Sequence, residues 1–277
     1  SPSFKSAIES FALVDMSCPL PWDLPGPIVS FIKHHQPRML LISRTDLWPE
    51  LIYQTHKNEI PSLLFSATKS KKPSMGSIKY ILQKWMLKKI NAVYAVSNQD
   101  RLNFLDSGAE VVQTKGDTRY DQVLERLSKP KELNEILLDN PKKLLTLVCG
   151  STWPEDEDVL IAAVEDLVKR DRLRVIVAPH EPSSSHLNYI TDEFQKWQIN
   201  VQLYTKSESW NDGSVLLIDR IGILAELYQK ADISFVGGSF RSTVHSVMEP
   251  LASGSLVFVG PFFQNNREAI EFRNEKL

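Results

Sequence analysis

Short apolar runs rich in β-branched residues alternate with longer segments of helical periodicity along this chain of 277 residues. Such an alternation predicts parallel sheets with helices packed on both faces. The runs in the second half are apolar at successive positions, as expected of strands buried on both faces. We predict strands at residues 12–16, 38–43, 62–66, 92–97, 111–114, 143–149, 174–178, 201–204, 215–218, 233–236 and 256–259.

Two domains are the expected organisation, because a chain of this length can bury two separate cores. A polar, helix-compatible stretch after Pro130 separates the two series of strands, so we place the boundary near residues 128–140. The domains then comprise residues 1–130 and 138–277. Both ends of the chain have helical patterns, and the last residues, REAIEFRNEKL, resemble the middle of a helix. We therefore expect both domains to be incomplete and the chain to be part of a longer protein.

Charge and cysteine content exclude several classes of protein. A formal net charge of −2 argues against a surface built for nucleic acid, so any anion site is local. Cys18 and Cys149 are far apart and lack the spacing of zinc sites or disulfide frameworks, so we expect no metal and a reducing compartment. No apolar run is long enough to span a bilayer, and the N-terminus lacks a secretory signal pattern.

The candidate binding residues follow strands of the second half, because ligands of such sheets bind beyond the carboxyl ends of the strands. Gly237 and Gly238 leave room for a phosphate, and His245 stands where the next helix is expected to begin with free N–H groups. An ordinary strand-to-helix turn is the alternative. Ser151 and Thr152 suit a helix cap, and their hydroxyls can also donate to a phosphate or a sugar carboxylate.

Two further side chains belong to the same set of candidates. Glu249 lies four residues after His245, on the same face of a helix, where a carboxylate can accept both hydroxyls of a ribose. A glutamate stabilised by the helix dipole is the alternative. His180 follows a buried strand and can hold an anion when protonated or hydrogen-bond a base edge when neutral; a purely structural loop histidine is the alternative.

A stretch without acidic residues runs from Ile60 to Gln99. It includes an amphipathic helix, whose apolar residues are Ile78, Ile81, Leu82, Trp85 and Met86. Its lysines are Lys69, Lys71, Lys72, Lys79, Lys84, Lys88 and Lys89. We expect the apolar face to pack in the core and the lysines to form a basic outer face. Attraction to an anionic membrane surface is a secondary role.

Several segments resemble motifs of the Kdo (3-deoxy-D-manno-octulosonate) transferases. Residues 45–50, TDLWPE, resemble the Thr-Glu-Leu-Trp-Pro-Asn motif, and residues 116–121, GDTRYD, resemble the segment that closes the N-terminal domain. Residues 150–154, GSTWP, are similar to the Gly-Ser-Thr-His-Pro turn. Residues 178–182, APHEP, resemble the Val-Pro-Arg-His-Pro loop. Residues 237–261 match the nucleotide-binding signature of the family in order and spacing.

The resemblance implies a GT-B fold, in which two Rossmann-like domains with parallel sheets face each other across a cleft. It implies an inverting, metal-independent and cofactor-free transfer of Kdo from CMP-Kdo to a lipid A precursor in lipopolysaccharide biosynthesis. The enzyme would act at the cytoplasmic face of the inner membrane, as a peripheral protein or anchored by an upstream segment. Asp46 would face the acceptor in the first domain. The donor-binding residues of the second domain would be Ser151, Thr152, His180, Gly237, Gly238, His245, Ser246 and Glu249.

The chain also departs from the family pattern. Ser246 replaces an Asn, Arg44 stands where an acidic residue is usual, and His180 replaces an Arg, which removes a permanent positive charge. The general-base glutamate is expected upstream of Ser1, so this chain is expected to bind the donor but to transfer poorly. A UDP-GlcNAc 2-epimerase-like enzyme and a non-catalytic nucleotide-binding relative are the rival interpretations. The Trp48-Pro49 pair and the spacing from His245 to Glu249 favour the transferase.

Overall fold

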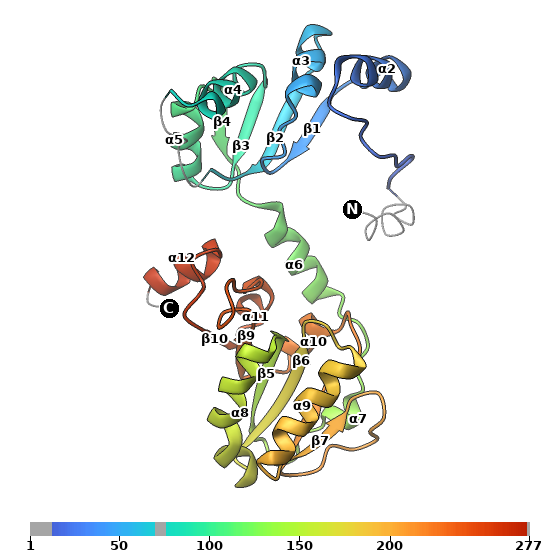
Figure 1. Ribbon diagram of the computed structural model, residues 1–277, viewed down its shortest axis with the longest axis vertical. Helices are drawn as coiled ribbons and strands as arrows, with labels where there is room; N and C mark the ends of the chain where they lie inside the picture. Colours follow the sequence, from blue (N-terminus) through green and yellow to red (C-terminus); the bar gives the residue numbers. More distant parts are fainter. Residues whose placement is uncertain (1–12, 70–75, 276–277) are drawn as a thin grey trace. The chain divides into compact units, whose positions relative to one another are not determined.

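The computed structural model describes residues 13–69 and 76–275. The chain divides into two compact units, Ser1–Thr118 and Arg119–Leu277, and each contains one parallel sheet with helices on its faces (Figure 1). Helix α6 (Thr118–Ser128) falls almost entirely in the second unit. The boundary predicted at residues 128–140 lies at the other end of this helix.

The first unit has a four-stranded sheet in which each strand pairs in parallel with the next. The strands are β1 (Leu40–Ser43), β2 (Ser62–Ala67), β3 (Ala92–Ala95) and β4 (Val112–Thr114). The helices are α2 (Pro25–His35), α3 (Pro49–Lys57), α4 (Ile78–Leu87) and α5 (Asn98–Asp106). The core between them is built around Ile52, Leu64, Leu87, Val93 and Phe104.

Local chemistry sets where the helices of this unit begin. Proline suits the first helical turn, and α3 begins at Pro49 after the extended residue Trp48. The carboxylate of Asp23 accepts the free N–H groups of Glu50 and Leu51 at 3.0 and 2.9 Å. The Trp-Pro motif therefore has a structural role as a helix start.

The strand predicted at residues 12–16 is wrong for the residues that the structure describes. Residue 12 lies outside them, and residues 13–16 contain a turn and a bend but no strand. Leu13 and Met16 are exposed, and the edge of the sheet is β1. An apolar run becomes a strand only where a neighbouring strand pairs with its backbone.

The expected packing of α4 is largely wrong as well. Met86 and Leu87 are buried, but the four preceding apolar residues are exposed: Ile78 by 85%, Ile81 by 60%, Leu82 by 40% and Trp85 by 39%. The helix reaches the core only through its last turn, because no described element covers its N-terminal half. The lysines do not form a uniform outer face either. Lys69 is buried, whereas Lys71 and Lys72 lie outside the described residues.

The second unit has a six-stranded parallel sheet in the order β10-β9-β5-β6-β8-β7. The strands are β5 (Leu145–Thr152), β6 (Leu173–Pro179), β7 (Asn200–Leu203), β8 (Ser214–Leu217), β9 (Ile233–Val236) and β10 (Leu256–Val259). The helices besides α6 are α7 (Glu135–Leu138), α8 (Pro154–Lys169), α9 (Ser184–Lys196), α10 (Leu224–Tyr228), α11 (Met248–Ala252) and α12 (Arg267–Glu275). From β5 the chain first forms β6, β7 and β8 on one side and then β9 and β10 on the other, so the topological switch point lies between β5 and β9.

Both faces of this sheet are covered, as the apolar strands predict. Leu147 and Cys149 of β5 pack with apolar residues of α8 and α9 on one face. Val148, between them, packs with Ile176 and with Tyr228 of α10 on the other face. In the part of the chain that the structure describes, no helix is long and apolar enough to cross a bilayer.

Candidate functional site

The carboxyl ends of β5, β6 and β9 meet at one edge of the second sheet. The N–H of His180, after β6, donates to the carbonyl of Thr152 at 3.0 Å, and the N–H of Gly237, after β9, donates to the carbonyl of Gly150 at 2.9 Å. The three loops therefore lie side by side at the switch point, where ligands of open parallel sheets bind.

The two glycines after β9 are required by close packing. A Cβ on Gly237 would lie 2.2 Å from the carbonyl oxygen of Ser151, and one on Gly238, whose φ is +85°, would lie 2.2 Å from that of Thr243. Their amides are already used, because that of Gly237 bonds to Gly150 and that of Gly238 donates to Asp156 at 2.6 Å. The two glycine amides are therefore engaged within the protein, and the role of Gly237 and Gly238 in binding a phosphate stays a prediction.

The carboxylate of Asp156 accepts backbone N–H groups that could otherwise bind an anion at this point. Its side chain is fully buried and accepts the backbone N–H groups of Trp153 at 3.0 Å, Gly238 at 2.6 Å and Phe240 at 3.0 Å. Carboxylates held by several amides are strongly stabilised in the charged form. Asp156 thus joins the start of α8 to the loop after β9. The bonds to Gly238 and Phe240 join residues more than 80 positions apart, so the sequence pattern does not indicate this role.

Thr152 faces the interior of the unit. It is fully buried, and its hydroxyl donates to Oε1 of Glu157 at 2.7 Å, while Oε2 of Glu157 lies 2.9 Å from Nε2 of His186. Burial raises the pKa of the Glu157 carboxyl, and the hydrogen bonds from Thr152 and His186 oppose that shift. The hydroxyl of Thr152 therefore supports the loop from within. Ser151, with φ +55°, lies partly exposed on the loop.

Three rings pack together above the ends of β5 and β6. The ring of His180 lies 4.8 Å from that of Trp153 and 4.4 Å from that of His245, at interplanar angles of 30° and 17°. The indole N–H of Trp153 donates to Nε2 of His245 at 3.0 Å, and the guanidinium of Arg241 lies 4.3 Å from the Trp153 ring. Burial, and secondly the neighbouring His180, lower the pKa of His245, whereas Asp156 raises it.

Glu249 lies on α11, but His245 and Ser246 do not. The helix begins at Met248, because the N–H of His245 donates to the carbonyl of Gly237 at 3.1 Å and holds this residue in the loop. The expected helical face shared by His245 and Glu249 is therefore wrong. Ser246 is exposed, and its hydroxyl accepts the N–H of Met248 at 3.4 Å.

The Glu249 carboxylate is half-buried and lies 3.5 Å from the guanidinium of Arg126 in α6. Burial raises its pKa, Arg126 opposes the shift, and Glu226 adds to it. A partly desolvated carboxylate beside an arginine can accept hydroxyl groups and still keep its charge.

Comparison with known proteins gives these loops a family context. Residues 2–122 match the family model described as 3-deoxy-D-manno-octulosonic-acid transferase (kdotransferase). The chain is 30% identical over 261 residues to the 3-deoxy-D-manno-octulosonic acid transferase of Haemophilus influenzae. The match covers 87% of this chain and 57% of that protein. It is 25% identical over 256 residues to the transferase of Aquifex aeolicus, covering 92% and 64%. The chain is thus similar to Kdo transferases over most of its length. It spans about 57% to 64% of the length of these two relatives.

Solved structures support the fold of this Kdo transferase relative. UDP-GlcNAc 2-epimerase from Neisseria meningitidis, solved with UDP-GlcNAc bound, has a TM-score of 0.56 at 13% identity and covers 94% of this chain and 76% of its own. At this identity the likeness shows the fold alone. Together with the two parallel sheets it confirms the predicted GT-B class with two Rossmann-like units.

In the Kdo transferase relative described here, the site combines residues that the motifs named with others that they did not. The structure brings Ser151, His180 and His245 together around one sheet edge. Arg241 and Arg126 were missed, and Trp153 was named only as part of the GSTWP motif, because the contacts of these side chains form only in the folded unit. Whether the site residues contact a donor stays a prediction. In the first unit, Asp46 is exposed in the loop after β1, and its acceptor role stays a prediction too.

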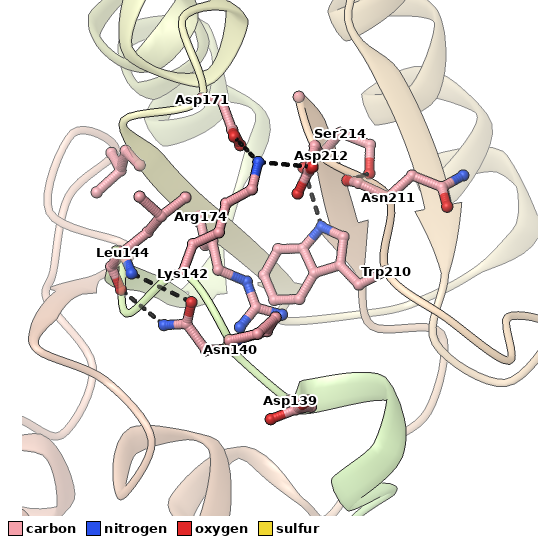
Figure 2. Close-up of a pocket in the computed structure, with 13 residues that line it drawn as sticks. Asp139, Asn140, Lys142, Leu144, Asp171, Arg174, Trp210, Asn211, Asp212 and Ser214 are labelled. Carbon is pink, nitrogen blue, oxygen red and sulfur yellow. Dashed lines mark hydrogen bonds and ion pairs between the residues drawn. The ribbon is translucent and has the colours of Figure 1, made fainter.

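A cavity of about 80 Å³ lies at the opposite, amino-terminal end of β5, β6 and β8 (Figure 2). Its charged groups have partners: Lys142 bridges Asp171 and Asp212, and the guanidinium of Arg174 lies 3.9 Å from the ring of Trp210. These contacts tie the segment after α7 to the sheet. The cavity is therefore interpreted as structural.

Proposed function

We propose that this chain is the donor-binding and acceptor-side part of a glycosyltransferase that moves Kdo from CMP-Kdo to a lipid A precursor in lipopolysaccharide biosynthesis. The observation that carries the proposal is the meeting of the β5, β6 and β9 loops at the switch point, with Ser151, His180, His245 and Glu249 around them. Similarity to Kdo transferases supports the same reaction class, an inverting transfer.

The chemistry of the site suits a negatively charged nucleotide-sugar. Arg126 and Arg241 supply permanent positive charge within the unit that carries the loops. The carboxylate of Glu249 is suited to accept two ribose hydroxyls. These groups position the donor, and the base that removes a proton from the acceptor hydroxyl must come from elsewhere. The general-base glutamate expected upstream of Ser1, and a reaction without metal or cofactor, stay predictions.

We further propose that the N-terminal half of α4 contacts an anionic membrane surface, which suits a peripheral enzyme at the cytoplasmic face of the inner membrane. Ile78, Ile81 and Leu82 are exposed on a segment without acidic residues. The ammonium of Lys89 lies 5.0 Å from the centre of the Trp85 ring. Exposed apolar side chains combined with lysines bind headgroup regions through both burial and charge.

Ligand-dependent thermal unfolding tests the donor assignment. A ligand that binds only the folded state stabilises it by about 2.7 kcal/mol at about 100 times its Kd. We expect CMP-Kdo and CMP to raise the melting temperature of the chain. Protection by UDP-GlcNAc without protection by CMP would overturn the donor assignment in favour of the epimerase-like rival. Donor binding without any transfer by the whole protein would favour the non-catalytic rival.

A further inference from the structure

The hydrogen bond between Trp153 and His245 determines the protonation state of the histidine. Indole nitrogen can only donate, and here it donates to Nε2 of His245 at 3.0 Å. Nε2 must therefore be unprotonated. A neutral imidazole with a free Nε2 carries its proton on Nδ1, and that N–H is the group the half-buried ring can offer to a ligand.

The surroundings of the pair are consistent with a neutral ring. The ring of His180 packs on that of His245 at 4.4 Å, and burial together with His180 disfavours a positive charge on His245. Asp156 of α8 favours the charged form, but its carboxylate is already held by three amides. The Glu249 carboxylate of α11 is paired with Arg126.

We propose that Trp153 is a positioning residue that holds His245 as the neutral Nδ1–H tautomer, so that His245 gives a single N–H to an anionic oxygen of the donor. The proposal has two halves. The tautomer half, that Trp153 fixes the proton of His245 on Nδ1, stands without the proposed function. The ligand half, that this N–H binds an anionic oxygen of the donor, rests on the proposed function. The family motif that this turn resembles has His at the position of Trp153. The device therefore depends on a residue at which this chain departs from that motif.

The tautomer half is tested by nitrogen NMR of the histidine rings. In the wild type, Nδ1 of His245 is expected to be protonated and Nε2 unprotonated. Trp153→Phe keeps an aromatic ring but removes the N–H, so His245 is expected to become a mixture of tautomers and to gain a proton at a higher pH than in the wild type. A His245 ring that is protonated on Nε2 in the wild type, or unchanged in Trp153→Phe, would overturn the proposal.

Trp210→Phe is the matched control. Trp210 also donates its indole N–H at 3.0 Å, to the carbonyl of Ser214, and also packs under an arginine, but at the other end of the sheet. Its substitution is expected to leave the His245 signals unchanged, and an equal effect of both variants would overturn a specific role for Trp153. If Trp153→Phe fails to fold, a pH titration of the wild type followed by NMR tests the proposal instead. Protonation of His245 must shift the Trp153 indole resonance, and a titrating His245 beside an unmoved indole would overturn the proposal.

The ligand half is tested with two probes that separate the two anionic groups of the donor. CMP carries the phosphate, and free Kdo carries the carboxylate. The probe that contacts His245 is expected to shift the Nδ1–H resonance in the wild type. Its binding to Trp153→Phe is expected to depend on pH more strongly than its binding to Trp210→Phe. If CMP binds but neither probe moves this resonance, the ligand half is overturned while the donor site stands. If neither probe binds, the proposed function fails and the tautomer result is unaffected.

Discussion

The carboxylate of Asp156 accepts the N–H of Gly238 across 82 residues of sequence at 2.6 Å. This bond locks the loop after β9 onto the start of α8, and the amides of Trp153 and Phe240 complete the same arrangement. The loops at the switch point are therefore held together by the side chain of Asp156. Preorganised loops lower the entropy cost of binding.

Replacing Asp156 should unfold this arrangement. Asp156→Ala leaves one buried and two partly buried N–H groups without their acceptor, and we expect a loss of about 3 kcal/mol in the free energy of unfolding. Urea unfolding of the chain measures it. Asp166→Ala, on the exposed side of the same helix, is the control and should change stability by less than about 1 kcal/mol. Equal stability of the two variants would contradict the role assigned to Asp156.

The pH dependence of stability should carry a signature of Glu157. Its pKa is raised by burial, so the folded state holds this proton more tightly than the unfolded state, where the pKa is about 4.3. The stabilisation is present below that value and is lost as the pH rises through the folded pKa. Glu157→Gln stays neutral, so it should gain stability relative to the wild type as the pH rises above about 4.3. Urea unfolding across this range is the measurement.

The control for this prediction is Glu155→Gln, because Glu155 lies on the same helical turn but is exposed. The difference between Glu155→Gln and the wild type should stay nearly constant with pH. The free energy of unfolding of Glu157→Gln could instead run parallel to that of the wild type, or fall relative to it as the pH rises. Either result would show that the buried carboxyl does not titrate in the assigned direction.

Glu249 should matter for nucleotide binding far more than for stability. If its carboxylate accepts the ribose hydroxyls, Glu249→Ala should weaken CMP binding by about 10-fold to 100-fold, since hydrogen bonds to a charged group contribute about 1.5–3 kcal/mol. Isothermal titration with CMP measures this. Glu125→Ala removes a carboxylate from an exposed pair with Lys129 and should bind CMP as the wild type does. Undiminished binding by Glu249→Ala would remove Glu249 from the site.

The exposed half of α4 should govern attachment to anionic vesicles. The double variant Ile78→Ser, Ile81→Ser should bind these vesicles at least about tenfold more weakly, because each isoleucine contributes about 1.5–3 kcal/mol when fully removed from water. Sedimentation with anionic and neutral vesicles gives the partition. Ile221→Ser is the control, since Ile221 is 78% exposed in the other unit. Equal loss in the control, or no preference for anionic lipid, would contradict the assignment.

The strands of the second sheet could be predicted because their pattern is local. Residues 233–236 and 256–259 are strands with the predicted bounds, since apolar runs between helical segments have one stable arrangement, burial between two helical layers. The pattern of α4 was equally clear, yet its packing was wrong. Periodicity shows that a helix has an apolar face but contains no information on whether another element covers it.

The sequence by itself determined the alternation of strands and helices, the two-unit organisation and the glycines, serines and histidines that end the strands of the second sheet. Only the tertiary structure decided that Asp156 occupies the amides of the glycine loop, that Thr152 points inward, and that Trp153 meets His245. The physical reason is the separation along the chain of the residues that interact. Helix and strand patterns arise from neighbours along the chain, whereas a hydrogen bond between residues 92 positions apart depends on the order in which the strands pair.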